Sequence, residues 1–319
     1  MTRWAKEVDH LLELSVVASF TRVGYTLRRR LAQWDPPTLP PATVVVVTGA
    51  TSGIGRAGAL DLARRGAFVI GVGRSHNRVD ELGEEIRRLH PRGEGRALQC
   101  DVSDLDDVSR LADSLNDGPP PTVLLHNAGA ISPSLTASAQ GIESTFAAQV
   151  VGPHLLTQRV ARGWNPVSNG RVVVMTSGGM YTQAFDLPSL LRPPEPYSGV
   201  STYARVKRAQ VVWVEALHSL KGLTSAAVHP GWTATAGLRD SLPRFSRLMT
   251  PLLRTAPEGA ADLVWLTGCP ELLEHPGSLW LDREVRPTHR LARTRTESAR
   301  DHATLLSYLS EVTSPYLDH

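Results

Sequence analysis

A short apolar strand that runs directly into a glycine-rich turn constrains the fold of this 319-residue chain more than any other feature. Thr43–Val47 is β-branched throughout, and so short an apolar run is typical of a buried parallel strand. Thr48–Gly55 follows with glycine at positions 49, 53 and 55, and apolar residues then recur with helical spacing over Ala57–Ala63. The glycines let the backbone approach a pyrophosphate, and the helix N-terminus offers free N–H groups. Strand, turn and helix in this order predict a dinucleotide-binding unit.

The rest of the chain alternates strand and helix patterns, which is typical of an α/β fold. We expect further strands at residues 68–72, 96–100, 122–126, 171–175 and 225–229, and helices at 79–89, 105–115, 142–162 and 203–220. The Pro-rich stretches 35–41 and 188–196 are expected to be connectors. The pattern predicts a Rossmann-type doubly wound parallel sheet in three α/β/α layers. We expect an N-terminal helical extension over residues 1–41 and a single Rossmann-fold domain, including a C-terminal extension, over 42–319.

Tyr203 and Lys207 place a phenol and an ammonium four residues apart, where side chains share one face of a helix. The chain has only three lysines against 31 arginines, so chance explains this spacing poorly. A phenol titrates near pH 10, and a neighbouring cation lowers its pKa. Taken alone, the pair could still be an ordinary solvated helix face.

The motifs taken together resemble the classical short-chain dehydrogenase/reductases. The resemblance runs over residues 42–282 and rests on Thr48–Gly55, Asn127–Gly129, Ser177, the Tyr203/Lys207 pair and Pro230–Gly231. A closer resemblance is to the branch called dehydrogenase/reductase family member 12. It rests on the strings Ser177–Met180, Tyr203–Ala204 with Lys207–Val212, His229–Trp232, Asp282–Arg283 and Thr288–His289.

The resemblance implies hydride transfer between a nicotinamide and a carbonyl or carbinol carbon. Tyr203 would give or take the proton of the oxygen, and Lys207 would lower the tyrosine pKa and hold the ribose hydroxyls. Ser177 would donate to the substrate oxygen, although it could also be an ordinary turn residue. The residues implied at the cofactor are Thr48, Gly49, Thr51, Ser52, Gly53, Ile54, Gly55, Arg74, Asp101, Val102, Asn127, Ala128, Gly129, Tyr203, Lys207, Pro230, Gly231 and Thr233.

Arg74 and Asp101, two of the residues implied at the cofactor, each have two possible roles. Arg74 stands after the second strand, where an acidic residue would hold the ribose 2′-hydroxyl of NAD(H), and no acid occurs until Asp80. A guanidinium can clamp a 2′-phosphate, so we expect NADP(H) rather than NAD(H). Arg74 could instead only stack on the adenine. Asp101 would bond the adenine edge, or serve as the N-cap of the helix that begins at Leu105.

Gln149 departs from the family pattern, which has a fourth catalytic residue, an asparagine, at this place in the long helix. That asparagine is thought to hold a water that links the lysine to bulk solvent. Gln149 keeps the amide but adds a methylene, and an error of about 1 Å can matter for catalysis. This departure puts turnover in question, and leaves cofactor binding unaffected.

The segments after residues 177 and 231 are apolar, and this indicates an apolar ketone, aldehyde or secondary alcohol as substrate. The apolar residues are Met180, Tyr181, Phe185, Leu187, Leu190, Leu191, Trp232, Leu238 and Phe245. They could equally form a packed lid or a surface between two copies of the chain. Two other functions stay open: an NADP(H)-binding sensor or scaffold with little turnover, and a nucleotide-sugar epimerase, which Asn127–Gly129 disfavours.

Composition limits the remaining functions. The net charge is +3 and Arg28–Arg30 is the one tight basic run, so we expect no nucleic-acid partner. Cys100 and Cys269 are too few for a disulfide framework, which suits a reducing, cytoplasmic compartment. No Cys/His spacing indicates a metal site.

The first 40 residues carry an apolar patch between Leu11 and Phe20 that is too short, and too closely flanked by charges, to span a bilayer. It has no basic start or cleavage site of a secretory signal. One interpretation is an amphipathic helix packed on the body or on a second subunit. The other is an interfacial membrane helix with Arg28–Arg30 at the headgroups.

Overall fold

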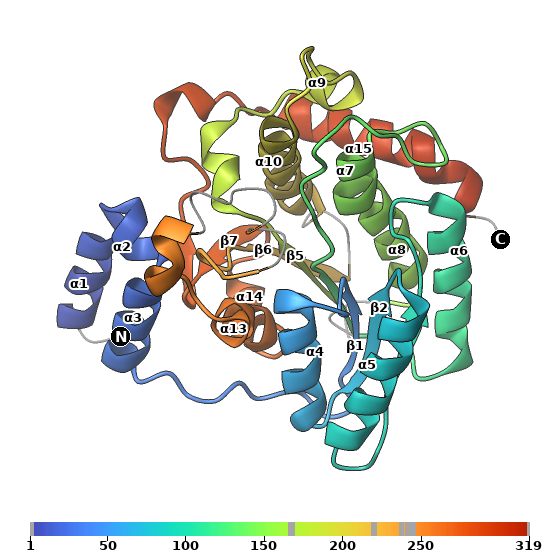
Figure 1. The fold of residues 1–319 in the computed structure, drawn as a ribbon, viewed down its shortest axis with the longest axis horizontal. Coiled ribbons are helices and arrows are strands. Elements are labelled where there is room, and N and C mark those ends of the chain that lie inside the picture. Colours follow the sequence, from blue (N-terminus) through green and yellow to red (C-terminus); the bar gives the residue numbers. More distant parts are fainter. Residues whose placement is uncertain (1–2, 165–169, 218–221, 236–238, 240–246, 318–319) are drawn as a thin grey trace.

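The computed structural model describes residues 3–164, 170–217, 222–235, 239 and 247–317, and its centre is one eight-stranded sheet (Figure 1). The strand order is β3-β2-β1-β4-β5-β6-β7-β8, in which β1 to β7 are parallel and β8 is antiparallel to β7. The strands are β1 (Val44–Thr48), β2 (Phe68–Gly73), β3 (Arg96–Gln99), β4 (Val123–His126), β5 (Gly170–Met175), β6 (Leu223–Val228), β7 (Ser278–Leu281) and β8 (Glu284–Arg286). The predicted strands are all present, shifted by at most two residues at each end.

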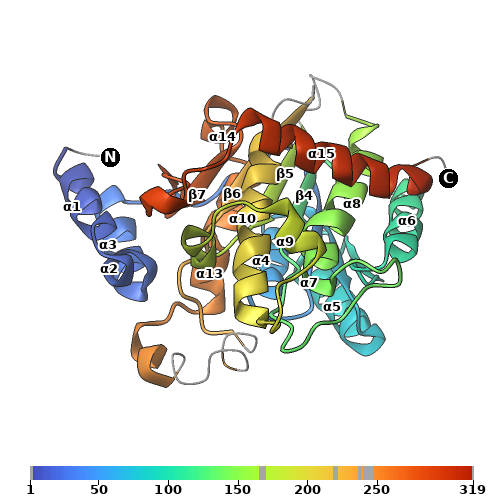
Figure 2. The ribbon, with the colours of Figure 1, turned by 90° about the horizontal axis from the view of Figure 1, so that it is seen from above.

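Helices cover both faces of the sheet, which confirms the predicted three-layer Rossmann-type fold (Figures 1 and 2). One apolar core lies beneath α4 (Gly53–Arg64), α5 (His76–Leu89), α13 (Ala256–Leu266) and α14 (Glu271–Glu274). The other lies beneath α6 (Leu105–Ser114), α8 (Gly152–Ala161), α10 (Gly199–Leu217) and α15 (Ala299–Thr313). Because β1 lies between β2 and β4 with both faces covered, all five of its residues are buried. This explains why its sequence does not alternate.

The long helix predicted over 142–162 is interrupted. It consists of α7 (Ser144–Phe146), a π-helical turn (Ala147–Val151) and α8. Pro153 at the start of α8 has no N–H, so it cannot donate to the carbonyl of Gln149 four residues earlier. Gly152 instead donates to Ala147 five residues back. The carbonyl of Gln149 is thereby released from the usual i+4 hydrogen bond of an α-helix.

The N-terminal segment forms three helices, so the expectation of one amphipathic helix was wrong. They are α1 (Arg3–Glu13), α2 (Val16–Phe20) and α3 (Arg22–Ala32). Ser15 caps α2 by accepting from the N–H of Ala18, and the extended backbone of Thr21 separates α2 from α3. The three helices form a lobe beside β7 and the C-terminal segments (Figures 1 and 2). Within the described residues, no helix is both long enough and apolar enough to cross a membrane.

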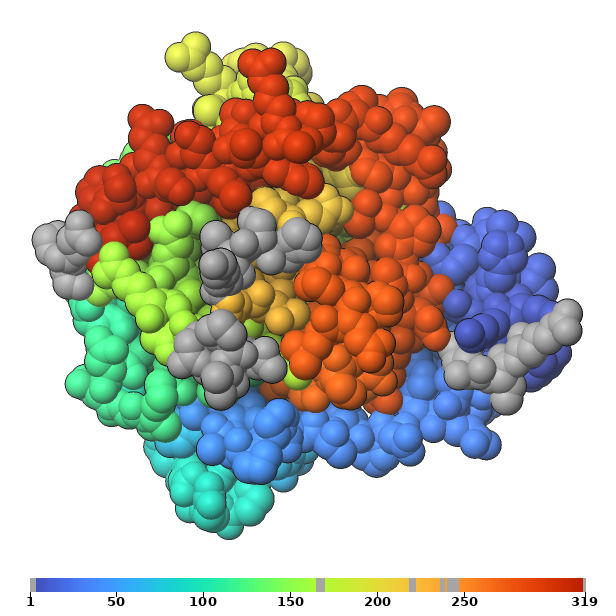
Figure 3. Space-filling model, turned by 180° about the vertical axis from the view of Figure 1, so that it is seen from behind, coloured from blue at the N-terminus to red at the C-terminus, as the bar shows by residue number. Residues whose placement is uncertain are grey.

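Some elements of the structure were not predicted from the sequence or differ from the prediction. The connector predicted at 188–196 contains most of a short helix, α9 (Leu187–Leu191), which Asp186 caps. The sequence reading did not anticipate β7, β8, α13, α14 or α15. Figure 3 shows the red C-terminal segment lying across the back of the molecule, and α15 there contacts α8 and α10.

Candidate active site

The predicted site residues lie together at the carboxyl edge of the sheet, because each follows the end of a parallel strand. Thr48–Gly55 follows or ends β1, Arg74 follows β2, Asp101 and Val102 follow β3, Asn127–Gly129 follows β4, Ser177 follows β5, and Pro230, Gly231 and Thr233 follow β6. In open parallel sheets this edge is where ligands bind. The π-helical turn after α7 adds Gln149, and α10 adds Tyr203 and Lys207.

The glycine turn is held in place by Asn127. Its side-chain amide donates to the carbonyls of Thr48 and Gly49 at 3.2 and 3.3 Å. The hydroxyl of Thr48 in turn accepts from the N–H groups of Asn127 and Ala128, both at 3.1 Å. A Cβ on Gly55 would stand 2.3 Å from the Asn127 amide nitrogen, so no larger residue fits there. Ser52 makes no side-chain cap on α4, which leaves the first N–H groups of that helix available to an anion.

Tyr203 and Lys207 do share a face of α10. The ammonium of Lys207 lies 5.1 Å from the centroid of the Tyr203 ring. Lys207 is 2% exposed, and its Nζ donates to the carbonyl of Met175 at the end of β5 at 2.8 Å. Ser177 comes two residues after that carbonyl and hydrogen-bonds to the Tyr203 side chain. The three side chains therefore converge at one point of the sheet edge.

Burial sets the protonation of this group. It raises the pKa of Tyr203 to about 12, while the hydrogen bond with Ser177 acts in the lowering direction. Burial also lowers the pKa of Lys207 to about 7. Desolvation therefore dominates the pKa of Tyr203, and the lowering expected from the lysine is not found. The phenol is protonated at neutral pH, which suits a proton donor.

Gln149 is buried on the π-helical turn and points toward the same place. Its Nε2 donates to the carbonyl of Ala130 at 3.1 Å. Its Oε1 is buried and has no hydrogen-bond partner among the described residues. That oxygen and the Nζ of Lys207 both border Gly129, at 3.0 and 3.4 Å from where a Cβ on Gly129 would stand. The amide is therefore near the lysine, as the position of the family asparagine would require.

The surroundings of Arg74 and Asp101 decide between some of their possible roles. The side chain of Arg74 is 74% exposed, and its nearest acid is Asp101, with 3.8 Å between Nη1 and Oδ2. Asp101 does not cap the helix that begins at Leu105, so that alternative was wrong. Asp104 does so by accepting from the N–H of Asp106, whereas Asp101 accepts from the N–H and hydroxyl of Ser103.

The loop after β6 is tied to the N-terminal lobe. Trp232 donates its N–H to the carbonyl of Phe20 at 2.7 Å, and the ring of Phe20 lies 4.2 Å from that of His229 between centroids. Gly231, with φ of 69°, leaves room for the side chain of Arg254. Thr233 is buried, and its hydroxyl donates to the carbonyl of Pro230.

Much of the apolar sequence near the site is structural core. Met180, Tyr181, Leu187 and Leu190 are buried in the same cluster as α10, which favours a packed lid for these four. Phe185 and Trp232 are partly buried against it. Leu238 and Phe245 lie outside the described residues. Of the apolar residues named from the sequence, Leu191 is exposed, and so are two that were not named, Leu135 and Val200.

A buried ion network that the sequence did not reveal connects the N-terminal lobe to the site loops. Asp282, after β7, accepts from Arg28 and Arg254 at distances of 2.6 to 2.9 Å. Arg28 is 2% exposed and also pairs with Asp9 and Glu13. Arg28 therefore cannot lie at membrane headgroups, so that part of the membrane interpretation was wrong. The signal available in the sequence was the Asp282–Arg283 string, but the ion-pair partners of Asp282 lie 28 and 254 residues away.

Comparisons with known proteins find relatives of one family. The family model for short chain dehydrogenases matches residues 43–187. "Dehydrogenase/reductase SDR family member 12" of Bos taurus is 30% identical over 92% of this chain and 93% of its own length. "Polyprenol dehydrogenase" of Mus musculus is 31% identical over 81% and 82% of the two chains. A solved short chain dehydrogenase from Burkholderia cenocepacia, in complex with NADP, is 26% identical with a TM-score of 0.59, over 74% of this chain and 94% of its own.

The chain therefore belongs to the short-chain dehydrogenase/reductase family. Its similarity to family member 12 extends over nearly the full length of both chains, including the segments outside the matched family model.

Proposed function

We propose that this protein is an NADP(H)-dependent oxidoreductase that transfers a hydride between the nicotinamide and an apolar ketone, aldehyde or secondary alcohol. The observation that carries the proposal is the convergence of Ser177, Tyr203 and Lys207 at the sheet edge that also holds the glycine turn. Binding and proton transfer would then take place within one site.

The cofactor residues fit a dinucleotide. The open N–H groups of α4 and the glycine turn would hold the pyrophosphate, and Lys207 has a third N–H beyond its two hydrogen bonds for a ribose hydroxyl. The bound nicotinamide supplies or accepts the hydride. Tyr203, protonated at neutral pH, would donate its proton to the carbonyl oxygen, and Ser177 would orient that oxygen.

NADP(H) is favoured over NAD(H) by Arg74. Its guanidinium is exposed where a ribose 2′-substituent would lie, and its contact with Asp101 is long. A 2′-phosphate could take the place of that contact through two parallel hydrogen bonds. The Burkholderia cenocepacia relative with bound NADP supports the same choice.

An apolar substrate is supported by the exposed side chains at the site edge. Leu135, Leu191 and Val200 are each 41–48% exposed on segments that follow β4 and β5. The mouse relative is named for polyprenol, which is an apolar alcohol. The alternative function, an NADP(H)-binding protein with little turnover, is favoured by one observation: the unpartnered Oε1 of Gln149 beside Lys207.

The test is a spectrophotometric screen of NADPH oxidation with a panel of apolar ketones and aldehydes, and of NADP reduction with the matching alcohols. We expect turnover with at least one apolar compound. Tyr203→Phe removes the hydroxyl and keeps the ring, so it should retain NADPH binding and lose turnover by orders of magnitude. NADPH binding without turnover by the wild type would support the sensor function instead.

A further inference from the structure

Gln210 lies one helical turn after Lys207 on α10 and is 1% exposed. Side chains three residues apart on a helix meet, and here the Nζ of Lys207 donates to the Oε1 of Gln210 at 2.9 Å. On its other side, the Nε2 of Gln210 donates to the backbone carbonyl of Gln149 at 2.8 Å. One amide thus joins the lysine to the π-helical turn.

The orientation of this amide is fixed by the backbone. The carbonyl of Gln149 lacks its α-helical donor because Pro153 has no N–H, and a carbonyl can only accept. The NH₂ group of Gln210 must therefore face the carbonyl, so its oxygen must face Lys207. The turn in the helix and the glutamine together present a permanent acceptor to the ammonium.

Neutral acceptors hold the charge of Lys207. Its nitrogen donates to the carbonyl of Met175 and to Gln210, and no carboxylate among the described residues forms an ion pair with it. From the other packed elements, Gly129 and Gln149 bring neutral groups, and Tyr203 is the titratable side chain that faces it. A buried ammonium without a counter-ion depends on such hydrogen bonds for its charge and its position.

We propose that Gln210 is a positioning residue of the active site, which holds Lys207 beside Tyr203 and keeps it charged through a direct amide link to the released carbonyl of Gln149. This inference rests on the proposed function, because it assigns the support of a lysine that binds the cofactor ribose. Gln210 itself contacts neither substrate nor cofactor.

Two variants of nearly the same size separate this role from packing. Gln210→Met removes both hydrogen bonds, so the ammonium loses an acceptor and the pKa of Lys207 should fall. Gln210→Glu puts an anion against the ammonium, so the pKa should rise. NADPH affinity, measured by fluorescence titration, should weaken above the pH at which Lys207 loses its proton. We expect this midpoint pH to be about one unit lower than in the wild type for Gln210→Met and about one unit higher for Gln210→Glu.

The methionine variant should also bind NADPH about tenfold more weakly at neutral pH, as expected for a lost hydrogen bond to a charged group. Gln158→Met is the matched control, since Gln158 is a partly buried glutamine on α8 and is not one of the two hydrogen-bond partners described for the Lys207 ammonium. Its pH dependence should match the wild type. Circular dichroism identifies the variants that fold.

Equal midpoints in the wild type and both Gln210 variants would overturn the inference, as would shifts in the same direction. The assay measures binding, so this outcome is separable from failure of the proposed function, which would appear as a wild type without turnover. If Gln210→Met does not fold, the direction of the shift in Gln210→Glu decides alone.

Discussion

Asp282 is the centre of the buried network that attaches the N-terminal lobe, and its replacement by asparagine should cost a large part of the protein's stability. Its carboxylate is 1% exposed and meets Arg254 at 2.6 and 2.9 Å and Arg28 at 2.7 Å. Asn keeps the shape but removes the charge. Arg28 retains Asp9 and Glu13, whereas Arg254 keeps two backbone carbonyls and the face of the Tyr25 ring, which carry no negative charge.

The magnitude follows from that difference. A buried cation left without its counter-ion destabilises a fold by about 3–5 kcal/mol. Proteins of ordinary stability have roughly 5–15 kcal/mol in total. We therefore expect Asp282→Asn to lower the free energy of unfolding in urea by about 3–5 kcal/mol. Trypsin should also cut faster at Arg29 and Arg30 on α3, because the lobe loses its anchor.

The pH dependence gives a second check. Burial alone would raise the pKa of Asp282, but Arg254 and Arg28 outweigh it and hold the pKa below its usual value. A lowered carboxyl pKa contributes stability above the unfolded value of about 3.9, and loses it as the pH falls through the folded value. The difference between wild type and Asp282→Asn should thus be constant near neutral pH and shrink below about pH 4.

Arg22→Met is the control for this experiment. Arg22 pairs with Glu258 at 2.9 Å, but its side chain is 54% exposed, and exposed pairs contribute about 0–1 kcal/mol. If Asp282→Asn lowers the free energy of unfolding by as little as Arg22→Met does, the reasoning that the lobe depends on the buried network is refuted.

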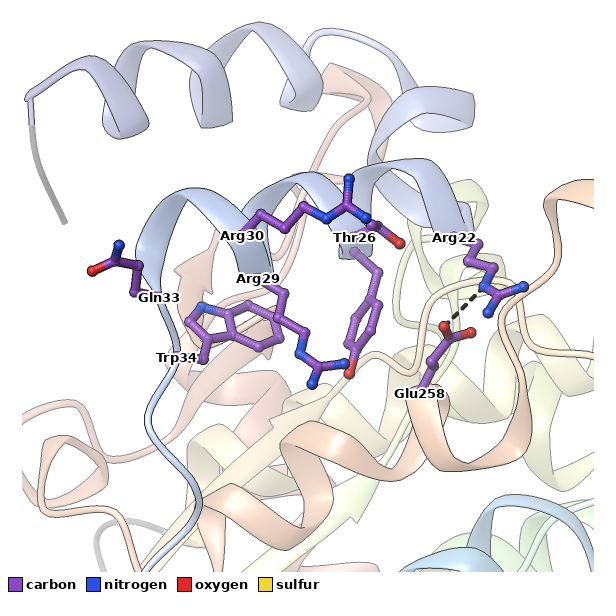
Figure 4. A pocket seen from close by; sticks show the side chains of 8 residues that line it. Arg22, Thr26, Arg29, Arg30, Gln33, Trp34 and Glu258 are labelled. Atoms are coloured by element: carbon purple, nitrogen blue, oxygen red, sulfur yellow. Dashed lines mark hydrogen bonds and ion pairs between the residues drawn. The ribbon is translucent and has the colours of Figure 1, made fainter.

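Three further predictions concern Arg74 at the cofactor, Gln149 and the N-terminal lobe. Arg74→Ala should weaken NADPH at least tenfold and NADH little in a fluorescence titration, and equal losses would mean that Arg74 does not read the 2′-phosphate. Gln149→Asn should raise the turnover number or move the pH optimum with NADPH affinity nearly unchanged, whereas superimposed pH–rate profiles would remove Gln149 from proton transfer. The lobe exposes Trp4, Leu11, Leu14, Val16, Val17 and Val23, and a cavity of about 480 Å³ against α3 is lined by Arg22, Arg29 and Arg30 together with Glu258 (Figure 4). We propose that this surface binds anionic lipid, so the protein should sediment with phosphatidylserine vesicles and less so as Arg29→Ala/Arg30→Ala, and a protein that stays in the supernatant would contradict this.

The parts of the structure that the sequence predicted are those set by neighbouring residues. The run Thr43–Val47 and the following glycines specify strand and turn locally, and the Tyr203/Lys207 spacing already fixes their common helix face. The class of fold followed from repeating such units. The family resemblance then indicated which residues would converge at the sheet edge.

The parts that were missed depend on distant residues or on one backbone group. Arg28 reads as part of a basic run, but its partner Asp282 lies 254 residues away in the chain. Pro153 sits at the ordinary first turn of a helix, and only the packing of α10 against the π-helical turn shows that Gln210 uses the carbonyl it releases. The apolar residues after Ser177 could not be divided into core and exposed surface without the fold.

Deuterium transfer tests the central claim most directly. NADPH that carries deuterium at the transferable C4 position is incubated with the protein and the best carbonyl compound from the screen, and the alcohol is analysed by mass spectrometry. We predict one deuterium on the carbinol carbon with the wild type, and almost none with Tyr203→Phe under conditions where that variant still binds NADPH. Unlabelled alcohol from the wild type, or equal labelling by both proteins, would contradict the proposed mechanism.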